Sequence, residues 1–201
     1  MKHKHVRREF DRAFFKHFYE DASTSVISEE DVFRRACFVL AYLSHLQVPI
    51  HTVLDAVCGT GLWKKALHDI DDSIGYFGID PSPYLCVRYG WFQSTVAGFR
   101  SKKKFDLVVC QDVMQYMGAD EVERSFAAIA RVCRGALYFD VPTTDDIDDR
   151  LLDMKKTDRK INVRSASWYR KRLAKHFENA GGGVFVAPRA RAVLLALERG
   201  R

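Results

Sequence analysis

The stretch Val53-Leu54-Asp55-Ala56-Val57-Cys58-Gly59-Thr60-Gly61 decides the fold of this 201-residue chain. It opens as a short apolar run, typical of a buried strand, and turns through Asp55 into a loop of small residues. A helix-like segment, residues 62–70, follows. Strand, glycine loop and helix in this order let the backbone approach a nucleotide-like ligand closely. The stretch therefore predicts a ligand site at the end of the first strand.

A second acid supports the same site. Gly78-Ile79-Asp80 closes another apolar run, at about the 20-residue distance that separates a glycine loop from a ribose-binding carboxylate. An ionised carboxylate is a pure acceptor with two oxygens, so Asp80 is suited to both hydroxyls of a ribose. The chain has no GxxxxGK[ST] motif, which excludes a P-loop. The third glycine of GxGxxG is also missing, which disfavours a dinucleotide.

Short apolar runs alternate with helical segments from residue 51 onward. The run Leu107-Val108-Val109-Cys110 is apolar throughout, which predicts a strand covered on both faces and hence a parallel sheet. Alternation of this kind predicts a doubly wound α/β fold with helices on both faces. The other apolar runs cover 52–56, 76–79, 91–96 and 136–139, and helical segments cover 62–70, 82–89 and 120–133.

Both ends of the chain depart from this alternation. Residues 1–48 predict a helical lid, with one helix bearing an aromatic stripe and a second that begins at the N-cap Ser28. The aromatic stripe either packs on the body of the protein or brings His17 and Tyr19 over the glycine loop. In the second case Tyr19 contacts the cofactor and His17 is a catalytic candidate.

The last third of the chain is expected to hold a short helix, a longer helix and a hairpin. Residues 143–167 form a charged insertion on the substrate side, with a short helix around 147–155. Residues 168–201 carry the terminal helix, which runs to Gly181. They also carry an antiparallel hairpin of 184–187 with 192–197. The whole is one domain, with the cofactor-binding core at 50–142 and a mostly parallel seven-stranded sheet.

The composition of the chain restricts the cellular compartment and the kinds of partner that we expect. No apolar run approaches the roughly 18 residues that span a bilayer, and the N-terminus lacks a secretory signal, so we expect no membrane association. The five cysteines lack CxxC spacing, which predicts buried free thiols in the cytoplasm and no metal site. The net charge of +6 permits an RNA partner, but the basic clusters are separate in sequence and a solvated surface is favoured. The oligomeric state is not determined by these patterns.

In three ordered motifs the chain resembles the class I S-adenosylmethionine-dependent methyltransferases. VLDAVCGTG at 53–61 is similar to the first motif of that family, usually VLDxGCGTG, and GID at 78–80 is similar to the second. FDLVVCQDVMQYM at 105–117 is similar to the fourth-strand segment and the loop after it. The resemblance covers residues 50–142 well and the C-terminal part loosely. It implies S-adenosylmethionine as the cofactor.

The resemblance also implies which positions face the cofactor. The first loop faces the methionine part, Asp80 the ribose and Pro81 the adenine. The positions so assigned are Asp55, Ala56, Val57, Cys58, Gly59, Gly61, Asp80, Pro81, Ser94, Thr95, Gln111, Asp112 and Val113.

Three positions depart from the family pattern. Val57 stands where the first loop glycine is usual, and a β-branched residue tolerates a positive φ poorly. The third strand ends without the acid that often contacts adenine, so Ser94 or Thr95 is expected to bond there. Tyr116 stands where a histidine is frequent; it either orients a substrate or packs against Met114 and Met117.

The acceptor is expected to be a small molecule methylated on oxygen, nitrogen or sulfur. The loop after the fourth strand lacks the Asn/Asp-Pro-Pro-Tyr/Phe pattern of base amino-methylation, and no cysteine has the setting of a pyrimidine carbon-5 enzyme. Because the cofactor carries an activated methyl group, a general base is optional. Asp140, at the end of the fifth strand, is a structural residue or a weak catalytic candidate. RNA or protein methylation, or a methyltransferase-like binding subunit, are the alternatives.

Overall fold

The computed structural model describes residues 27–149, 151, 158 and 161–200. Six helices lie in this part of the chain: α2 (Glu29–His45), α3 (Leu62–Ile70), α4 (Pro83–Tyr89), α5 (Ala119–Val132), α6 (Thr144–Asp148) and α7 (Ala166–Leu173), and a single 3₁₀ turn is η2 (Met114–Tyr116). The strands are β1 (Thr52–Ala56), β2 (Gly75–Asp80), β3 (Phe92–Gln93), β4 (Phe105–Gln111), β5 (Cys133–Asp140), β6 (Glu178–Gly181) and β7 (Val184–Val186).

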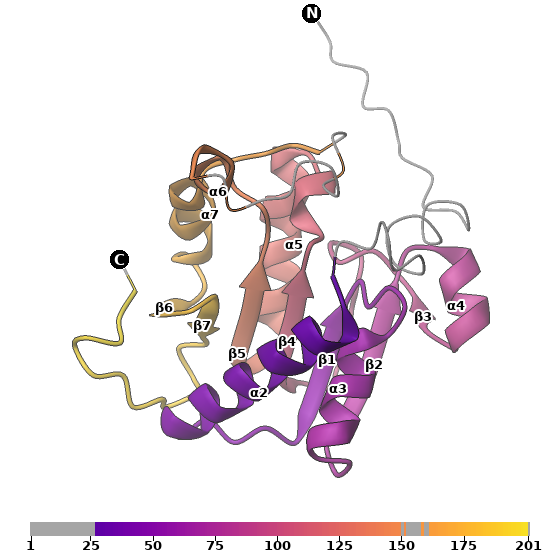
Figure 1. Ribbon diagram of the computed structural model, residues 1–201, viewed down its shortest axis with the longest axis horizontal. Helices are drawn as coiled ribbons and strands as arrows, with labels where there is room; N and C mark the ends of the chain where they lie inside the picture. The colour runs from indigo at the N-terminus through magenta and orange to yellow at the C-terminus, as the bar shows by residue number, and fades with distance from the viewer. Residues whose placement is uncertain (1–26, 150, 152–157, 159–160, 201) are drawn as a thin grey trace, which may run out of the picture.

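The strands form one sheet in the order β3-β2-β1-β4-β5-β7-β6 (Figure 1). Strands β1 to β5 pair in parallel, and β7 runs antiparallel to both β5 and β6. This confirms the predicted doubly wound, mostly parallel seven-stranded sheet with an antiparallel C-terminal pair. The order reverses between β1 and β4, where a ligand crevice is expected in sheets of this kind.

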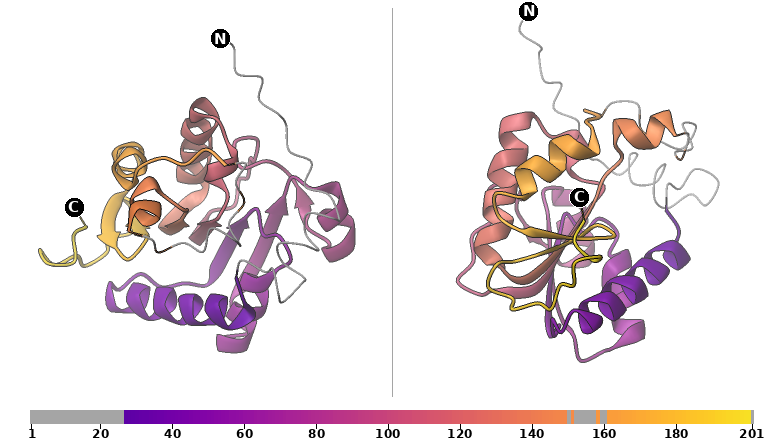
Figure 2. Two further views of the ribbon diagram at one scale, coloured as in Figure 1. Left: turned by 45° about the horizontal axis from the view of Figure 1, so that its top comes forward. Right: turned by 90° about the vertical axis from the view of Figure 1, so that its left-hand side faces the viewer.

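Helices cover both faces of the sheet. Figure 2 shows α2 and α3 on one side and α5 and α7 on the other. Strand β4 is buried over almost its whole length because Leu107 and Val109 pack under α2 and α3, while Val108 and Cys110 pack toward α5. The unbroken apolar run of the sequence therefore follows from burial on both faces.

Helix α2 begins at Ser28 as expected and is fixed there by a capping box. The Ser28 hydroxyl accepts a hydrogen bond from the Asp31 amide at 3.1 Å, and the Asp31 carboxylate accepts one from the Ser28 amide at 3.1 Å. Its buried side is formed by Val32, Ala36, Val39 and Leu43, which pack into the core shared with α3. Helix α2, which was predicted as part of a lid, is thus one of the helices that cover the sheet. Residues 1–26, with His17 and Tyr19, lie outside the described residues.

The C-terminal hairpin differs from the prediction. Its strands are β6 and β7, not 184–187 with 192–197, and α7 ends at Leu173 well before Gly181. The reason is the turn: Gly182 and Gly183 both have positive φ, +57° and +78°, as a two-residue hairpin turn of the primed type requires. The glycines therefore join two strands, where the sequence pattern suggested a helix end.

Two further boundaries were misplaced. Strand β3 spans Phe92–Gln93 and not 91–96. The Ser94 amide makes the last bond to β2, at Asp80, and Thr95 then starts a turn in which its carbonyl oxygen accepts from the Phe99 amide at 3.0 Å. Helix α6 lies at Thr144–Asp148, earlier than the expected 147–155, because Thr143 and Asp146 form a second capping box. A capping side chain sets the start of a helix more sharply than apolar periodicity does.

Candidate active site

The glycine loop is held tightly against β2. The amides of Val57 and Cys58 both donate to the carbonyl oxygen of Ile79, at 2.9 and 3.0 Å, and the Gly61 amide donates to the Cys58 carbonyl at 2.9 Å. Val57 adopts a φ of +72°, the left-handed conformation that the usual glycine would take. The strain expected for a β-branched residue at this position is therefore present in the fold.

Gly59 and Asp80 meet at the carboxyl ends of β1 and β2. Asp80 is 1% exposed, and its Oδ2 accepts from the Gly59 amide at 3.0 Å while Oδ1 accepts from the Ser82 amide at 2.8 Å. A Cβ built on Gly59, which has a φ of +55°, would meet no atom within 4 Å. The loop thus forms an open cradle beside a buried carboxylate, which suits a ribose-bearing ligand.

Trp91 supports this loop from beneath, a role that sequence reasoning missed. Its Nε1 donates to the Gly59 carbonyl at 3.0 Å, and a Cβ on Gly61 would lie 2.9 Å from its ring atom Cζ2. The ring also packs on Tyr76, with centroids 5.9 Å apart. Gly61 is therefore required by the approach of Trp91 as well as by its φ of +84°. An aromatic residue at the start of a short strand was the sequence signal.

Asp55 lies in the interior, behind the loop. It is 3% exposed and accepts a hydrogen bond of 2.6 Å from the Tyr76 hydroxyl. Burial raises its pKa to about 7, with a further increase from the charge of Asp80, against the lowering by Tyr76. Burial likewise raises the pKa of Asp80 to about 6. A cationic ligand nearby would favour the ionised forms of both groups.

Gln111 and Asp112 end β4 on the floor of the same crevice. The side-chain oxygen of Gln111 accepts from Trp63 Nε1 at 2.9 Å, and its Nε2 donates to Asp112 Oδ2 at 3.1 Å. Asp112 has a φ of +54°, and η2 begins after Val113. Burial and the charge of Asp140 raise the pKa of Asp112 to about 6.

Asp140 ends β5 next to this group and pairs with Arg35 of α2. Its backbone carbonyl accepts from the Asp112 amide at 2.9 Å, which joins the ends of β4 and β5. The Asp140 charge raises the pKa of Arg35, although burial of the guanidinium acts in the opposite direction. Arg35 was not singled out in the sequence, because a single basic residue on a helix gives no signal there.

The remaining predicted cofactor residues divide between the core and the surface. Ala56, Cys58 and Val113 are buried, and burial raises the pKa of the Cys58 thiol. Pro81 is half-buried after β2. The Ser94 amide donates to the Asp80 carbonyl at 3.0 Å, but the Ser94 hydroxyl donates to the Thr95 carbonyl, and the Thr95 hydroxyl accepts from the Gly98 amide. Both hydroxyls thus bond within their own turn.

Tyr116 and Gln115 lie in η2, above the ends of the strands. Tyr116 packs in a small cluster around Leu85 and not with Met114 and Met117, which belong to the core under α5. The side-chain oxygen of Gln115 is buried and has no hydrogen-bond partner among the described residues. A buried carbonyl oxygen without a donor costs free energy, so this oxygen is an unsatisfied acceptor in the interior.

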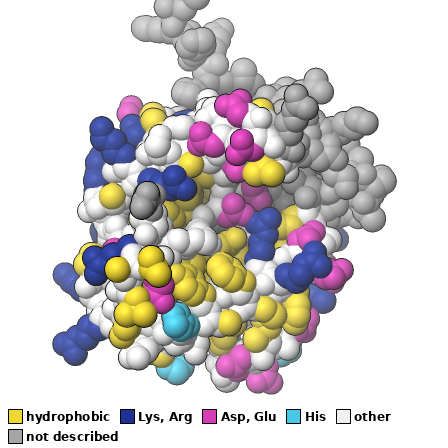
Figure 3. All heavy atoms as spheres, turned by 60° about the vertical axis from the view of Figure 1, so that its left-hand side comes forward, with side chains coloured by type: hydrophobic (Ala, Val, Ile, Leu, Met, Phe, Trp, Pro, Cys, Tyr) yellow, Lys and Arg dark blue, Asp and Glu magenta, His cyan; other side chains and the backbone are white. Residues whose placement is uncertain are grey.

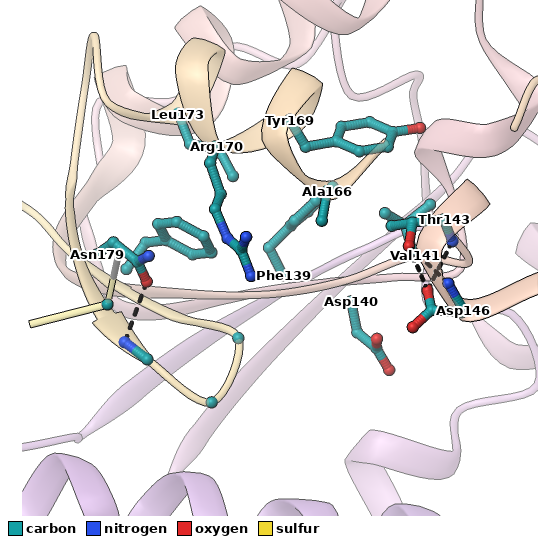
Figure 4. A pocket seen from close by; sticks show the side chains of 15 residues that line it. Phe139, Asp140, Val141, Thr143, Asp146, Ala166, Tyr169, Arg170, Leu173 and Asn179 are labelled. Atoms are coloured by element: carbon teal, nitrogen blue, oxygen red, sulfur yellow. Dashed lines mark hydrogen bonds between the residues drawn. The ribbon is translucent and has the colours of Figure 1, made fainter. Parts of the chain in front are cut away.

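A pocket of about 360 Å³ opens at the ends of β5, β6 and β7 (Figure 4). It is bounded by α6, by α7 and by the glycine turn of the hairpin. Residues 161–165 are fixed to the segment after β4, where Arg164 donates to the Met117 carbonyl at 2.6 Å and the Asn162 amide to the Gln115 carbonyl at 2.7 Å. The lining includes Asp140, whose backbone carbonyl accepts a hydrogen bond from the Asp112 amide, whereas Gln111 and Asp112 do not line the pocket.

Basic side chains do not form a single footprint on the face that Figure 3 shows. Lysine and arginine lie scattered there among acidic and hydrophobic side chains. Within the described residues no helix is long and apolar enough to cross a membrane. The same part of the chain holds no group of His, Cys, Asp and Glu side chains that is suited to a metal ion.

Solved structures share this fold. One is the magnesium protoporphyrin IX methyltransferase of Synechocystis PCC 6803 with bound S-adenosylmethionine. It is similar to this chain with a TM-score of 0.60 at 19% identity, and the match covers 90% of this chain and 94% of that protein. The N-methyltransferase NodS of Bradyrhizobium japonicum WM9, in complex with S-adenosylhomocysteine, gives a TM-score of 0.54 at 16% identity over 77% of this chain and 87% of its own.

A third structure is longer than this chain. The S-adenosylmethionine-dependent methyltransferase of Clostridium acetobutylicum ATCC 824 gives a TM-score of 0.53 at 17% identity, over 69% of this chain. The chain spans 61% of the length of that protein. No protein with a curated description is similar enough to count as a match.

The sequence profile of a family described as a methyltransferase domain matches residues 28–181, which is more than half of the chain. The matched residues run from the start of α2 to the end of β6 and include the glycine loop, Asp80 and the loop after β4. This confirms the resemblance to class I S-adenosylmethionine-dependent methyltransferases that the three motifs indicated. The chain belongs to the methyltransferase-domain family.

Proposed function

We propose that this chain uses S-adenosylmethionine to methylate an oxygen, nitrogen or sulfur atom of a small molecule. The observation that carries the proposal is the hydrogen bond between the buried Asp80 carboxylate and the amide of Gly59, a glycine with open space above it. Structures similar in fold contain S-adenosylmethionine or S-adenosylhomocysteine. When bound, S-adenosylmethionine supplies an activated methyl group on a cationic sulfur.

The residues of this chain contribute binding and alignment. Asp80 offers carboxylate oxygens to ribose hydroxyls, and Gly59 allows close approach of the ligand to the backbone. Asp112 and Asp140 put negative charge at the ends of β4 and β5, where attraction to a cationic sulfonium favours binding of the cofactor over its neutral product. None of these residues needs to act as a base, because alignment and exclusion of water supply much of the catalysis.

The size and place of the pocket favour a small acceptor. Its volume of about 360 Å³ is at the lower end of the roughly 300–1,000 Å³ typical of small-molecule sites. One of its lining residues, Asp140, accepts a backbone hydrogen bond from Asp112, a residue assigned to the cofactor side. The five cysteines are all unpaired, which suits a reducing compartment, and we place the protein in the cytoplasm on that ground.

Titration calorimetry tests the cofactor. We expect S-adenosylmethionine and S-adenosylhomocysteine to bind, and ATP not to bind, because the loop has no phosphate-cradling motif. The absence of heat with both sulfur ligands at high protein concentration would exclude the enzyme and support a methyltransferase-like binding subunit. If the substrate is RNA, RNA binding should instead weaken strongly as the salt concentration rises.

A further inference from the structure

Part of the lining of the pocket beside Asp140 is apolar. Phe139, Tyr169 and Phe185 line it together with Leu173, and each of these side chains is at most 7% exposed. The Phe139 ring lies 5.4 Å from that of Tyr169 and 6.4 Å from that of Phe185, between centroids. The glycine turn forms the opposite wall and presents backbone without side chains. This lining suits a flat or slender apolar group.

Arg170 brings a positive charge into this apolar space. Figure 4 shows its side chain descending from α7 into the pocket, with Asn179 on one side and Asp140 on the other. Its guanidinium makes no hydrogen bond or ion pair with any other residue in the described part of the chain. The residue is exposed, so the guanidinium is also open to water where it lines the pocket.

The acids of the pocket are already satisfied by other groups. The Asp146 carboxylate accepts from the Thr143 amide at 2.7 Å and from the Thr143 hydroxyl at 2.6 Å, in the cap of α6. The Asp140 carboxylate pairs with Arg35. The partner of Asp146 is neutral, and Arg170 is the cation among the described lining residues, without a side-chain hydrogen bond or ion pair of its own.

Asn179 adds donors next to Arg170. Its side-chain oxygen accepts from the Gly181 amide at 3.0 Å, which leaves the side-chain nitrogen to donate. A guanidinium and an amide nitrogen at one end of an apolar pocket make a site for a planar anion, because the arginine fork matches the two oxygens of a carboxylate.

We propose that the methyl acceptor is a small carboxylic acid with an apolar body, held by its carboxylate at Arg170. The acid group is then an anchor, and the atom to be methylated lies toward Asp140, the lining residue whose carbonyl is bonded to the amide of Asp112. This inference rests on the proposed function, and it adds the chemical class of the acceptor.

The test compares acids with their uncharged counterparts. The probes are 4-hydroxybenzoate, 3,4-dihydroxybenzoate and salicylate, each paired with its primary carboxamide, and binding to protein saturated with S-adenosylhomocysteine is followed by ligand-observed NMR. We expect the acids to bind about tenfold or more tightly than the amides, the usual contribution of a charged hydrogen bond. Equal binding of acids and amides, or no binding by any acid, would overturn the proposal.

Two variants assign the effect to the pocket. Arg170→Gln should remove the preference for acids, whereas Lys171→Gln removes the same charge from the next residue of α7, outside the pocket lining, and should keep it. A preference that survives Arg170→Gln contradicts the role of this residue. Arg170→Lys keeps the charge but loses the planar fork, so an intermediate preference is expected.

The proposed cofactor is tested separately. Calorimetry with S-adenosylhomocysteine should give the same affinity for the wild type, Arg170→Gln and Lys171→Gln, because Arg170 does not touch the glycine loop. Failure of S-adenosylhomocysteine to bind the wild type would refute the proposed function. Normal binding without a preference for acids would refute only the acceptor class.

Discussion

The carboxylate of Asp80 and the amide of Gly59 are joined by a hydrogen bond of 3.0 Å, although they are 21 residues apart in the chain. The bond links the end of β2 to the loop after β1, so that the acid and the open glycine face one crevice. The second Asp80 oxygen accepts from the Ser82 amide. The two backbone amides together favour the ionised carboxylate and partly offset the rise in the Asp80 pKa that burial causes.

Replacement of the Asp80 carboxylate should weaken cofactor binding. Asp80→Asn keeps the shape of the side chain but loses the charge that strengthens hydrogen bonds to ribose hydroxyls. We expect the affinity for S-adenosylhomocysteine to fall about tenfold or more, as measured by calorimetry. Asp72→Asn, at an exposed position, is the control and should bind normally. Unchanged affinity of Asp80→Asn would remove Asp80 from the site.

Relief of the strain at Val57 should not harm the site. Val57→Gly removes a β-branched residue from a φ of +72°, a conformation that costs roughly 1–3 kcal/mol. The loss of apolar contacts and the greater freedom of glycine in the unfolded chain offset part of this gain. We expect equal or tighter binding of S-adenosylmethionine, with the free energy of unfolding within about 1 kcal/mol of the wild type by urea denaturation. A tenfold loss of affinity would show that the Val57 side chain itself contacts the cofactor.

A side chain at Gly59 should abolish binding. Gly59→Val places its branched carbons in the open space above the loop, where the cofactor is proposed to lie. Gly90→Val is a matched control, because Gly90 also has a positive φ, +74°, and open space around its Cα, but it caps α4. Both variants should be destabilised to a similar degree in thermal unfolding, and Gly90→Val should still bind S-adenosylmethionine. If Gly59→Val binds it normally, the site assignment is wrong.

The buried Asp55 should give the stability a characteristic dependence on pH. Its pKa of about 7 in the fold lies above the ordinary value of 3.8, so the folded state holds the proton more tightly than the unfolded state. The stability that follows from this proton is complete below about pH 4 and is lost as pH rises to about 7, at a slope of up to about 1.4 kcal/mol per pH unit.

Asp55→Asn removes this pH-dependent contribution to stability, and the side-chain oxygen of the asparagine still accepts a hydrogen bond from the Tyr76 hydroxyl. Urea denaturation at several values between about pH 4 and about pH 8 should therefore show the wild type losing stability relative to Asp55→Asn as pH rises. Comparison of the two proteins cancels the groups that they share, such as Asp106, whose pKa is lowered by Arg134 and Thr52 against the effect of burial. Parallel curves for the two proteins would contradict the raised pKa of Asp55.

Local patterns in the sequence determined much of the fold and many of the residues of the proposed cofactor site. The run 107–110 is apolar because β4 is buried on both faces, and the Ser28 capping box starts α2 where the sequence indicated. The loop 53–61 and Asp80 carry their conformation and chemistry locally, since glycine is needed where φ is positive and a carboxylate where hydroxyls are to be bound. The strain at Val57 was visible for the same reason.

The tertiary structure decided what depends on residues far apart in the chain. Trp91 reaches Gly59 from the position before β3, Arg35 meets Asp140 across 105 positions, and Arg170 lines a pocket completed by the glycine turn of the hairpin. The hairpin itself was misplaced because three glycines look alike as a helix end and as a turn. Packing of β7 against β5 selects between the two. Local propensity fixes which backbone conformations are available, and only burial in the assembled sheet determines which side chains share a site.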